Sequence, residues 1–244
     1  MPSALDVHAE LEADRASREA EIRLIEQMHD SSDNEDDQVR LRRIIVMLTY
    51  AHLEGFCRFA LTAYASTING MGLTCSTASP AIAAAGLSNV FGALRDSQRK
   101  HDVFRKALPN DTALHLSARE QQFVVDYETI SKINVQIPDK LIDMKSNVDT
   151  DILKKLLFQL GLDFESVETH RSVLNRLLGT RNAIAHGDRL KEPKKEQVAE
   201  YLVAARSIMA FIQDEVFNAL KNDTFLKPKS MPPEPQGDGA QPLH

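Results

Sequence analysis

The segment from Arg181 to Gly187 holds the residues best suited to chemistry, namely Arg181, Asn182 and His186. An arginine is always charged, and its planar guanidinium binds phosphate and the negative charge that develops on it. A histidine exchanges protons near neutral pH and therefore serves as a general acid or base. The spacing alone is weak evidence, because chance gives about half an occurrence of such a pair. The context is stronger: His186 is expected to end a helix, with Gly187 as its left-handed capping glycine.

Two interpretations of this segment stay open from the residues alone. On a straight helix, residues five apart lie about 140° apart, so Arg181 and His186 would meet poorly on one rigid helix. A catalytic site would need a bend at the helix end, or a second copy of the chain to complete it. In the alternative, Arg181 pairs with a nearby carboxylate and His186 hydrogen-bonds the last carbonyls of its helix, which the helix dipole favours.

A second polar group lies on the most apolar helix that the sequence predicts, over residues 39–68. Glu54 and Arg58 are four residues apart, the spacing of an ordinary helical ion pair that contributes roughly a few tenths of a kcal/mol. Charges on so apolar a helix are costly to bury without partners, so an accessory role at a site is an equally open interpretation. His52, on the same helix, is interpreted as a core histidine whose hydrogen bonds are satisfied.

The charge of the whole chain bears on whether it binds nucleic acid. The net charge is −6, which counts mildly against RNA because affinity for nucleic acid comes largely from neutralising phosphates. Any RNA contact would therefore be local, although charged runs are more often plain solvated surface. The candidate basic clusters are Arg95, Arg99, Lys100, Arg105 and Lys106, and then Lys191, Lys194 and Lys195.

The elements that must position these residues are predicted to be helices. Hydrophobic residues make up 43% of the chain, and the ten glycines and ten prolines are few enough to leave long helices intact. The stretch over residues 111–148 is left open between strand and helix. Apolar spacing and capping residues predict helices over residues 3–28, 39–68, 80–86, 88–108, 149–160, 167–186 and 193–222.

The predicted fold class is all-α, a helical bundle with an insert of mixed or irregular structure. An N-terminal helix occupies residues 1–30, and the main domain runs over residues 38–221 with its insert at about 70–148. Residues 222–244, rich in proline, are predicted to be a disordered tail. The apolar seam of the last helix suits either packing inside the bundle or a dimer contact.

Several classes of protein and of site find no support. No run of about 18 uncharged apolar residues is present, and the N-terminus lacks the basic start and apolar segment of a signal peptide. We therefore expect a cytoplasmic protein that is not associated with a membrane. Cys57 and Cys75 are too few for a disulfide framework and lack zinc-site spacing. There is no phosphate-binding loop, nucleophile elbow or H-E-x-x-H motif. We therefore expect no cofactor and no metal.

The residues from Arg181 to Gly187 resemble the R-x4-H motif of HEPN domains, in the form with a polar residue after Arg and Gly after His. Further segments resemble the MAE-like branch of HEPN nucleases. They are Tyr50-Ala-His-Leu-Glu-Gly-Phe-Cys-Arg58 within the predicted buried helix, Lys145-Ser-Asn-Val-Asp-Thr-Asp-Ile-Leu, and Leu160-Gly-Leu-Asp. The resemblance covers about residues 39–217.

This resemblance implies a helical bundle that forms a homodimer with two R-x4-H motifs face to face. It implies a metal-independent endoribonuclease that leaves 2′,3′-cyclic phosphate and 5′-OH ends on RNA. His186 would move the proton, Arg181 would stabilise the phosphorane, and Asn182 would orient either group. Glu54 and Arg58 resemble an accessory polar motif of some HEPN nucleases.

The resemblance also implies a setting and leaves a second function open. The setting is a toxin–antitoxin or antiviral defence system, in which an inhibitor or activator protein is a further partner. The second function is a non-catalytic HEPN module that dimerises and binds RNA, a nucleotide or a partner protein. The acidic net charge favours this module, whereas the intact Arg181, Asn182 and His186 disfavour it.

Overall fold

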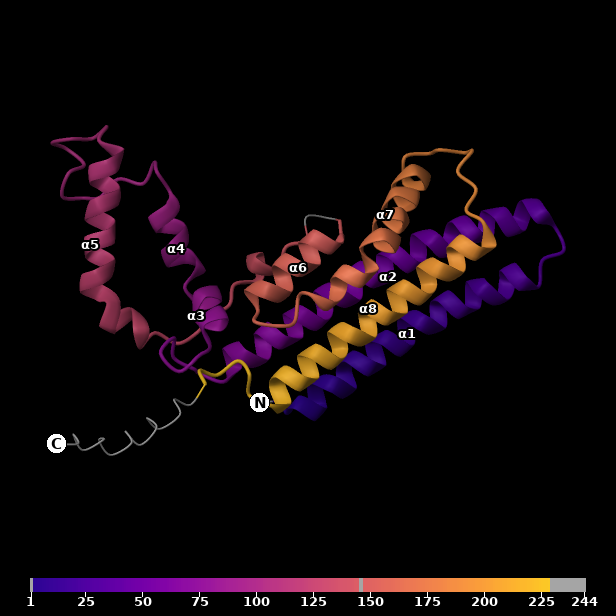
Figure 1. The fold of residues 1–244 in the computed structure, drawn as a ribbon, viewed down its shortest axis with the longest axis horizontal. Helices are drawn as coiled ribbons and strands as arrows, with labels where there is room; N and C mark the ends of the chain where they lie inside the picture. The colour runs from indigo at the N-terminus through magenta and orange to yellow at the C-terminus, as the bar shows by residue number, and fades with distance from the viewer. Residues whose placement is uncertain (1, 145–146, 229–244) are drawn as a thin grey trace, which may run out of the picture.

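The computed structural model describes residues 2–144 and 147–228, and its regular structure is helical (Figure 1). The elements are α1 (Ala4–Asp30), α2 (Glu35–Gly70), α3 (Pro80–Gly86), α4 (Ser88–Arg95), α5 (Thr112–Ser131), the 3₁₀ helix η1 (Asp139–Ile142), α6 (Thr150–Gln159), the 3₁₀ helix η2 (Ser166–His170), α7 (Arg171–Ala185) and α8 (Lys195–Lys221). Extended pairing among the described residues is limited to two isolated bridges. The predicted all-α class is confirmed.

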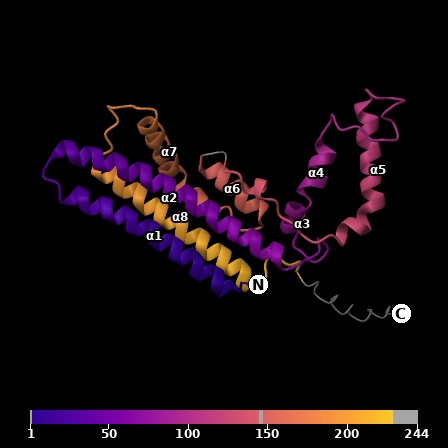
Figure 2. The same cartoon turned by 180° about the vertical axis from the view of Figure 1, so that it is seen from behind.

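Three long helices, α1, α2 and α8, form the main bundle and lie side by side in both views (Figure 1 and Figure 2). They form because each carries an apolar stripe, and burying one such side chain contributes about 1.5–3 kcal/mol. The apolar seam of α8 packs inside this bundle, which is one of the two roles that the sequence left open for it. The buried residues of the seam are Val198, Leu202, Ala205, Met209, Ile212, Val216 and Ala219. The helix α1 packs on α2 and α8 of its own chain.

Two shorter helices, α6 and α7, pack onto this bundle and carry the segment of interest. As predicted, α6 begins at Asp149, whose side chain accepts a hydrogen bond from the Ile152 N–H at 2.8 Å. Gly161, just beyond its end, has φ +70°, as a capping glycine should. Arg171 at the start of α7 pairs with Asp151 at 2.7 Å, which ties the two helices together.

The helices α4 and α5 form a pair that projects away from the bundle (Figure 1). The predicted helix over residues 88–108 is wrong beyond Arg95, where α4 ends. The Asp96 carboxylate accepts a hydrogen bond from the Gln98 N–H at 2.9 Å, and such local bonds compete with the helix. The stretch that the sequence left open between strand and helix begins with α5 and continues, beyond Ser131, with an isolated bridge at Asn134 and the 3₁₀ helix η1.

The predicted disordered tail is wrong for its first residues, 222–228. Phe225 is buried, and its carbonyl accepts a hydrogen bond from the Ser79 N–H at 2.7 Å. The Lys227 N–H donates to the Thr77 carbonyl at 2.9 Å. An aromatic side chain directly after α8 can enter the core, which offsets the entropy of ordering this short segment. Residues 229–244 of the predicted tail lie outside the described residues.

The longest helix, α2, has the length and apolar composition of a membrane-spanning helix. Half of its most apolar window is buried inside the fold, where α1, α7 and α8 pack against it. The core helix of a bundle satisfies the same criterion, because it must be apolar wherever neighbours cover it.

Candidate functional site

The C-terminal end of α7 exposes the His186 side chain. The Asp188 N–H donates to the Ala183 carbonyl at 3.0 Å and the Gly187 N–H to the Ile184 carbonyl at 3.1 Å, which is a Schellman motif. Gly187 has φ +86°, a conformation that glycine adopts without strain. Within the described residues, the imidazole of His186 forms neither a hydrogen bond nor an ion pair, and it faces solvent. The predicted helix end is confirmed.

Arg181 is held in place by an aromatic ring. Its guanidinium lies over the ring of Tyr50 in α2, with 4.6 Å between the guanidinium carbon and the ring centroid. Its Nη1 donates to the side-chain oxygen of Asn182 at 2.9 Å. No carboxylate pairs with Arg181 anywhere in residues 2–144 and 147–228. A cation–π contact of this kind contributes about 0.5–2 kcal/mol and leaves the positive charge available to an anion.

Tyr50 joins three elements at this point. Its side chain is fully buried, and its hydroxyl accepts a hydrogen bond from the Val148 N–H at 2.5 Å, just before α6 begins. Burial raises the pKa of Tyr50, so the phenol stays neutral at physiological pH. Because Arg181 lies on the face of the same ring, one side chain of α2 fixes both the start of α6 and the guanidinium on α7.

Arginines of α2 hold the loop that follows the motif. Nη1 of Arg43 donates to the carbonyls of Asp188 at 2.8 Å and of Lys191 at 2.6 Å, while Nε of Arg42 donates to the Pro193 carbonyl at 3.0 Å. A hollow of about 660 Å³ lies between the start of α2 and this loop. Its charged lining is Arg40, Arg42, Arg43, Arg189 and Lys194, with Glu35, Asp36 and Glu192. The predicted cluster that includes Lys191 is thus part of a larger basic region.

The predicted accessory pair is present as an ion pair. Nη2 of Arg58 lies 3.3 Å from the Glu54 carboxylate, so the ordinary helical pair that the sequence allowed is formed. Glu54 follows Tyr50 by one turn of α2, and its charge acts on the Tyr50 hydroxyl. His52 is buried, as predicted, and its Nε2 lies 3.2 Å from the Glu21 carboxylate of α1. This contact lacks hydrogen-bond geometry, so the prediction that the hydrogen bonds of His52 are satisfied is wrong for Nε2. An active role for Glu54 and Arg58 stays a prediction.

The described residues do not form the contacts that the purely structural interpretation of the motif predicts. Arg181 has no carboxylate partner among the described residues, and it is the backbone N–H of His186, not its ring, that engages the end of α7, with 2.9 Å to the Asn182 carbonyl. No hydrogen bond joins Arg181 to His186 in the part of the chain that the structure describes. Within the described residues, one chain therefore offers a guanidinium and an imidazole that are not hydrogen-bonded to each other.

Other reactive groups are less suited to catalysis. Cys57 and Cys75 are free and buried, and burial raises the pKa of both thiols, which disfavours the reactive thiolate. Among the described residues, no three His, Cys, Asp or Glu side chains come together as a metal site.

Two contributors to this region were not singled out from the sequence as site residues. The role of Arg43 had a local signal, because Arg40, Arg42 and Arg43 form a basic cluster at the start of a long apolar helix. The position of Tyr50 in the sequence gave no such signal, since its contact with Arg181 depends on how α7 crosses α2.

Comparison with known proteins agrees with this arrangement. A family model described as RiboL-PSP-HEPN matches residues 13–218, which span the bundle, the α4–α5 pair and the motif. No protein of curated function and no solved structure matches the chain. HEPN domains are often ribonucleases, so the match supports an RNA-related function. The HEPN assignment is confirmed, whereas the MAE-like branch stays a prediction. The chain belongs to the RiboL-PSP-HEPN family.

Proposed function

We propose that this protein is a metal-independent endoribonuclease that acts as a homodimer. The observation that carries the proposal is the free end of α7, where an exposed His186 imidazole without a partner lies five residues from Arg181. The Arg181 guanidinium is positioned by Tyr50 and has no carboxylate partner among the described residues. A purely structural motif would engage both side chains, whereas an anionic substrate needs them free.

The proposed reaction needs only groups that this chain and its substrate supply. The 2′-OH of RNA attacks the adjacent phosphorus and loses its proton, and the bond from phosphorus to the 5′-oxygen breaks. His186 moves a proton as general base or acid, and Arg181 stabilises the charge on the phosphorane. Asn182, bonded to Arg181, orients the guanidinium. The products are a 2′,3′-cyclic phosphate and a 5′-OH, and DNA is not cleaved because it lacks the nucleophile.

A second copy of the chain supplies what one copy lacks. Arg181 and His186 are not hydrogen-bonded to each other within the described residues of one chain, whereas in a dimer with facing motifs Arg181 of one copy can act with His186 of the other. Apolar side chains lie exposed beside the motif: Leu190 is 90% exposed and Ile44 is 47% exposed. Leu190 lies in the loop that Arg43 holds, and Ile44 follows Arg43 on α2. Burial of these side chains favours dimerisation at this end of the molecule.

Local charge supports an RNA contact despite the acidic chain. The arginines at the start of α2 and the cations of the loop after α7 lie together beside the motif. Such a region neutralises phosphates locally, so its affinity for RNA depends on salt more than on the net charge of −6. Glu54 and Arg58 would be accessory to this region.

The proposal is tested with purified protein and mixed cellular RNA in EDTA, with the ends of the products mapped. We expect the wild type to cleave, and His186→Ala and Arg181→Ala to lose cleavage by at least about a hundredfold. The matched controls lie on the same helix or just before it: His170→Ala and Arg176→Ala remove the same side chains outside the motif and should cleave normally. Cleavage by His186→Ala at the wild-type rate would overturn the proposal.

A second candidate function is a non-catalytic module that dimerises and binds RNA, a nucleotide or a partner protein. The net charge of −6 favours it over an enzyme that must hold a polyanion. No cleavage by a folded, dimeric wild type, together with RNA binding that His186→Ala retains, would support it. In either form, we place the protein in the cytoplasm, in toxin–antitoxin or antiviral defence, where an inhibitor or activator protein controls it.

A further inference from the structure

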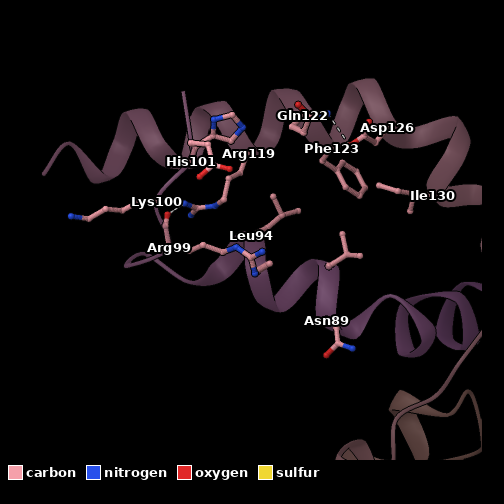
Figure 3. A pocket seen from close by; sticks show the side chains of 13 residues that line it. Asn89, Leu94, Arg99, Lys100, His101, Arg119, Gln122, Phe123, Asp126 and Ile130 are labelled. Atoms are coloured by element: carbon pink, nitrogen blue, oxygen red, sulfur yellow. Dashed lines mark hydrogen bonds between the residues drawn. The ribbon is translucent and has the colours of Figure 1, made fainter. Parts of the chain in front are cut away.

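A pocket of about 520 Å³ lies between α4 and α5, in the part of the chain inserted between α2 and α6. Figure 3 shows that its two ends differ in chemistry. Arg99, Lys100, His101 and Arg119 gather at one end, and the aromatic ring of Phe123 lies toward the other end with Leu94 in between. The pocket therefore combines a cationic end with an apolar end. Its volume is in the range of about 300–1,000 Å³ that small-molecule sites occupy.

The cationic end is built around a buried arginine. Arg119 is only 8% exposed, and its two terminal nitrogens donate to the backbone carbonyls of Arg99 and of Asp96. Its Nε is buried without a partner, and within the described residues no carboxylate pairs with it. A buried charge is costly unless it is paired, so this guanidinium leaves a site where an anion is stabilised.

The charged groups around Arg119 leave this positive end uncompensated. Of the two acids that line the pocket, Asp102 pairs with Arg105 at 3.2 Å, and Asp126 accepts a hydrogen bond from the Gln122 amide at 2.9 Å. Arg99 and Lys100 are exposed and form no ion pair in the described part of the chain. Arg99 and Arg119 thus lie at one end of the pocket, with Lys100 beside them and its ammonium turned outward in Figure 3, while the acids of the pocket are already engaged.

We propose that this pocket binds a nucleotide, with the phosphate at the cationic end and the base against Phe123. Guanidinium groups are the preferred partners of phosphate, and bases stack on aromatic rings. The side chain of Gln122 on α5 also lines the pocket, and its amide oxygen can accept a hydrogen bond from a base edge. A free nucleotide and a nucleotide within an RNA strand share this chemistry. The inference does not rest on the ribonuclease proposal, because none of these residues belongs to the motif.

The test is calorimetric titration of the full chain with four probes: adenosine monophosphate, adenosine, inorganic phosphate, and a single-stranded RNA hexamer. We expect adenosine monophosphate to bind at least about tenfold more tightly than adenosine or phosphate alone, because only the nucleotide occupies both ends. Binding of the hexamer but not of adenosine monophosphate, measured with His186→Ala so that the RNA stays intact, would assign the site to RNA strands if Arg99→Ala with Lys100→Ala removed it, and would overturn the proposal if it did not. Binding of neither would overturn the proposal.

Matched variants separate this pocket from general surface charge. Arg99→Ala with Lys100→Ala removes two exposed cations that line the pocket, whereas Lys106→Ala with Lys132→Ala removes two exposed cations of the same insert that do not line it and form no ion pair with the described residues. We expect the first pair to weaken binding by at least about tenfold and the second pair by less than about threefold. Equal losses in both double variants would overturn the assignment of the ligand to this pocket.

Discussion

Tyr50 links the stability of the fold to the position of Arg181. Its ring lies under the guanidinium and its hydroxyl accepts from the buried Val148 N–H at 2.5 Å. A buried N–H without an acceptor costs about 1–3 kcal/mol. The hydroxyl therefore stabilises the start of α6, while the ring alone supports Arg181, and the two contributions can be separated by substitution.

Substituting Tyr50→Phe should lower the free energy of unfolding by about 1–3 kcal/mol, because the Val148 N–H loses its acceptor. Tyr64→Phe is the matched control on the same helix. Its hydroxyl is equally buried but has no hydrogen-bond partner among the described residues, so its removal should cost less than about 0.5 kcal/mol. Urea denaturation followed by circular dichroism, at one fixed protein concentration, measures both values. Equal losses for the two variants would contradict the role given to the Val148 bond.

The end of α7 is the element that determines where His186 lies. Gly187 has φ +86° and Gly179 lies within the helix, and a Cβ added at either position would meet no atom within 4 Å. The two sites therefore differ in backbone conformation and not in available space. This makes them a matched pair for testing how much the left-handed cap contributes to stability.

Gly187→Ala should destabilise the protein by about 1 kcal/mol, because an L side chain is strained at positive φ. Gly179→Ala should stabilise it by about 0.5–1 kcal/mol, because alanine favours a helix. Thermal or urea unfolding of both variants measures the difference. If Gly187→Ala were as stable as Gly179→Ala, the cap would not hold the chain after His186 in the geometry described.

The contact between α1 and α2 should make stability depend on pH through His52. Burial is the main cause that lowers the pKa of His52 below its ordinary value of 6.5. The positive charge of Arg18 lowers this pKa further, whereas the Glu21 carboxylate raises it. The unfolded chain therefore binds a proton more readily than the folded one. The stability that neutral His52 provides is full above pH 6.5 and is lost as pH falls through the lowered pKa of the folded state.

We therefore expect the free energy of unfolding of the wild type to fall from pH 7 toward acid more steeply than that of His52→Gln. His170, whose pKa burial also lowers, contributes in the same direction, so only the difference between the two proteins reports on His52. Urea unfolding at a series of pH values measures it. Parallel pH profiles would show that His52 accepts a proton equally well in both states.

The sequence predicted the helices best where a local signal marks their ends. Asp149, Gly161 and Gly187 placed the ends of α6 and α7 correctly, because capping depends on neighbouring residues. The end of α4 was missed because it depends partly on Arg119, more than twenty residues away, which binds the carbonyl of Asp96. In the same way, Arg181 and His186 were found from spacing and resemblance, whereas the ring under Arg181 required the fold.

Across the whole molecule, the motif and the α4–α5 pocket lie at opposite ends of α2. Arg43, near its start, holds the loop after the motif, and Asn69, near its end, accepts from the Ile137 N–H at 2.7 Å, beyond α5 (Figure 1). These positions on the helix are separated by about 40 Å at 1.5 Å per residue. Binding in the pocket and cleavage at the motif can therefore be tested independently of each other.

The proposed homodimer makes a prediction that no single chain can fulfil. If Arg181 of one copy acts with His186 of the other, a mixture of Arg181→Ala and His186→Ala proteins rebuilds one intact site in each mixed dimer. Random exchange makes about half of the dimers mixed, and each has one of two sites restored, so about a quarter of wild-type cleavage should return. The measurement is RNA cleavage by the two variants, each alone and after denaturation and refolding together.

The control is the same refolding of each variant with itself, which should restore nothing. A return of about a quarter of the activity would mean that the two side chains, which are not hydrogen-bonded to each other among the described residues of one chain, form the site across the dimer interface. No return, from a mixture shown to contain mixed dimers, would mean that each site needs both residues from one copy. The bend at the end of α7 would then have to bring His186 toward Arg181 when RNA binds.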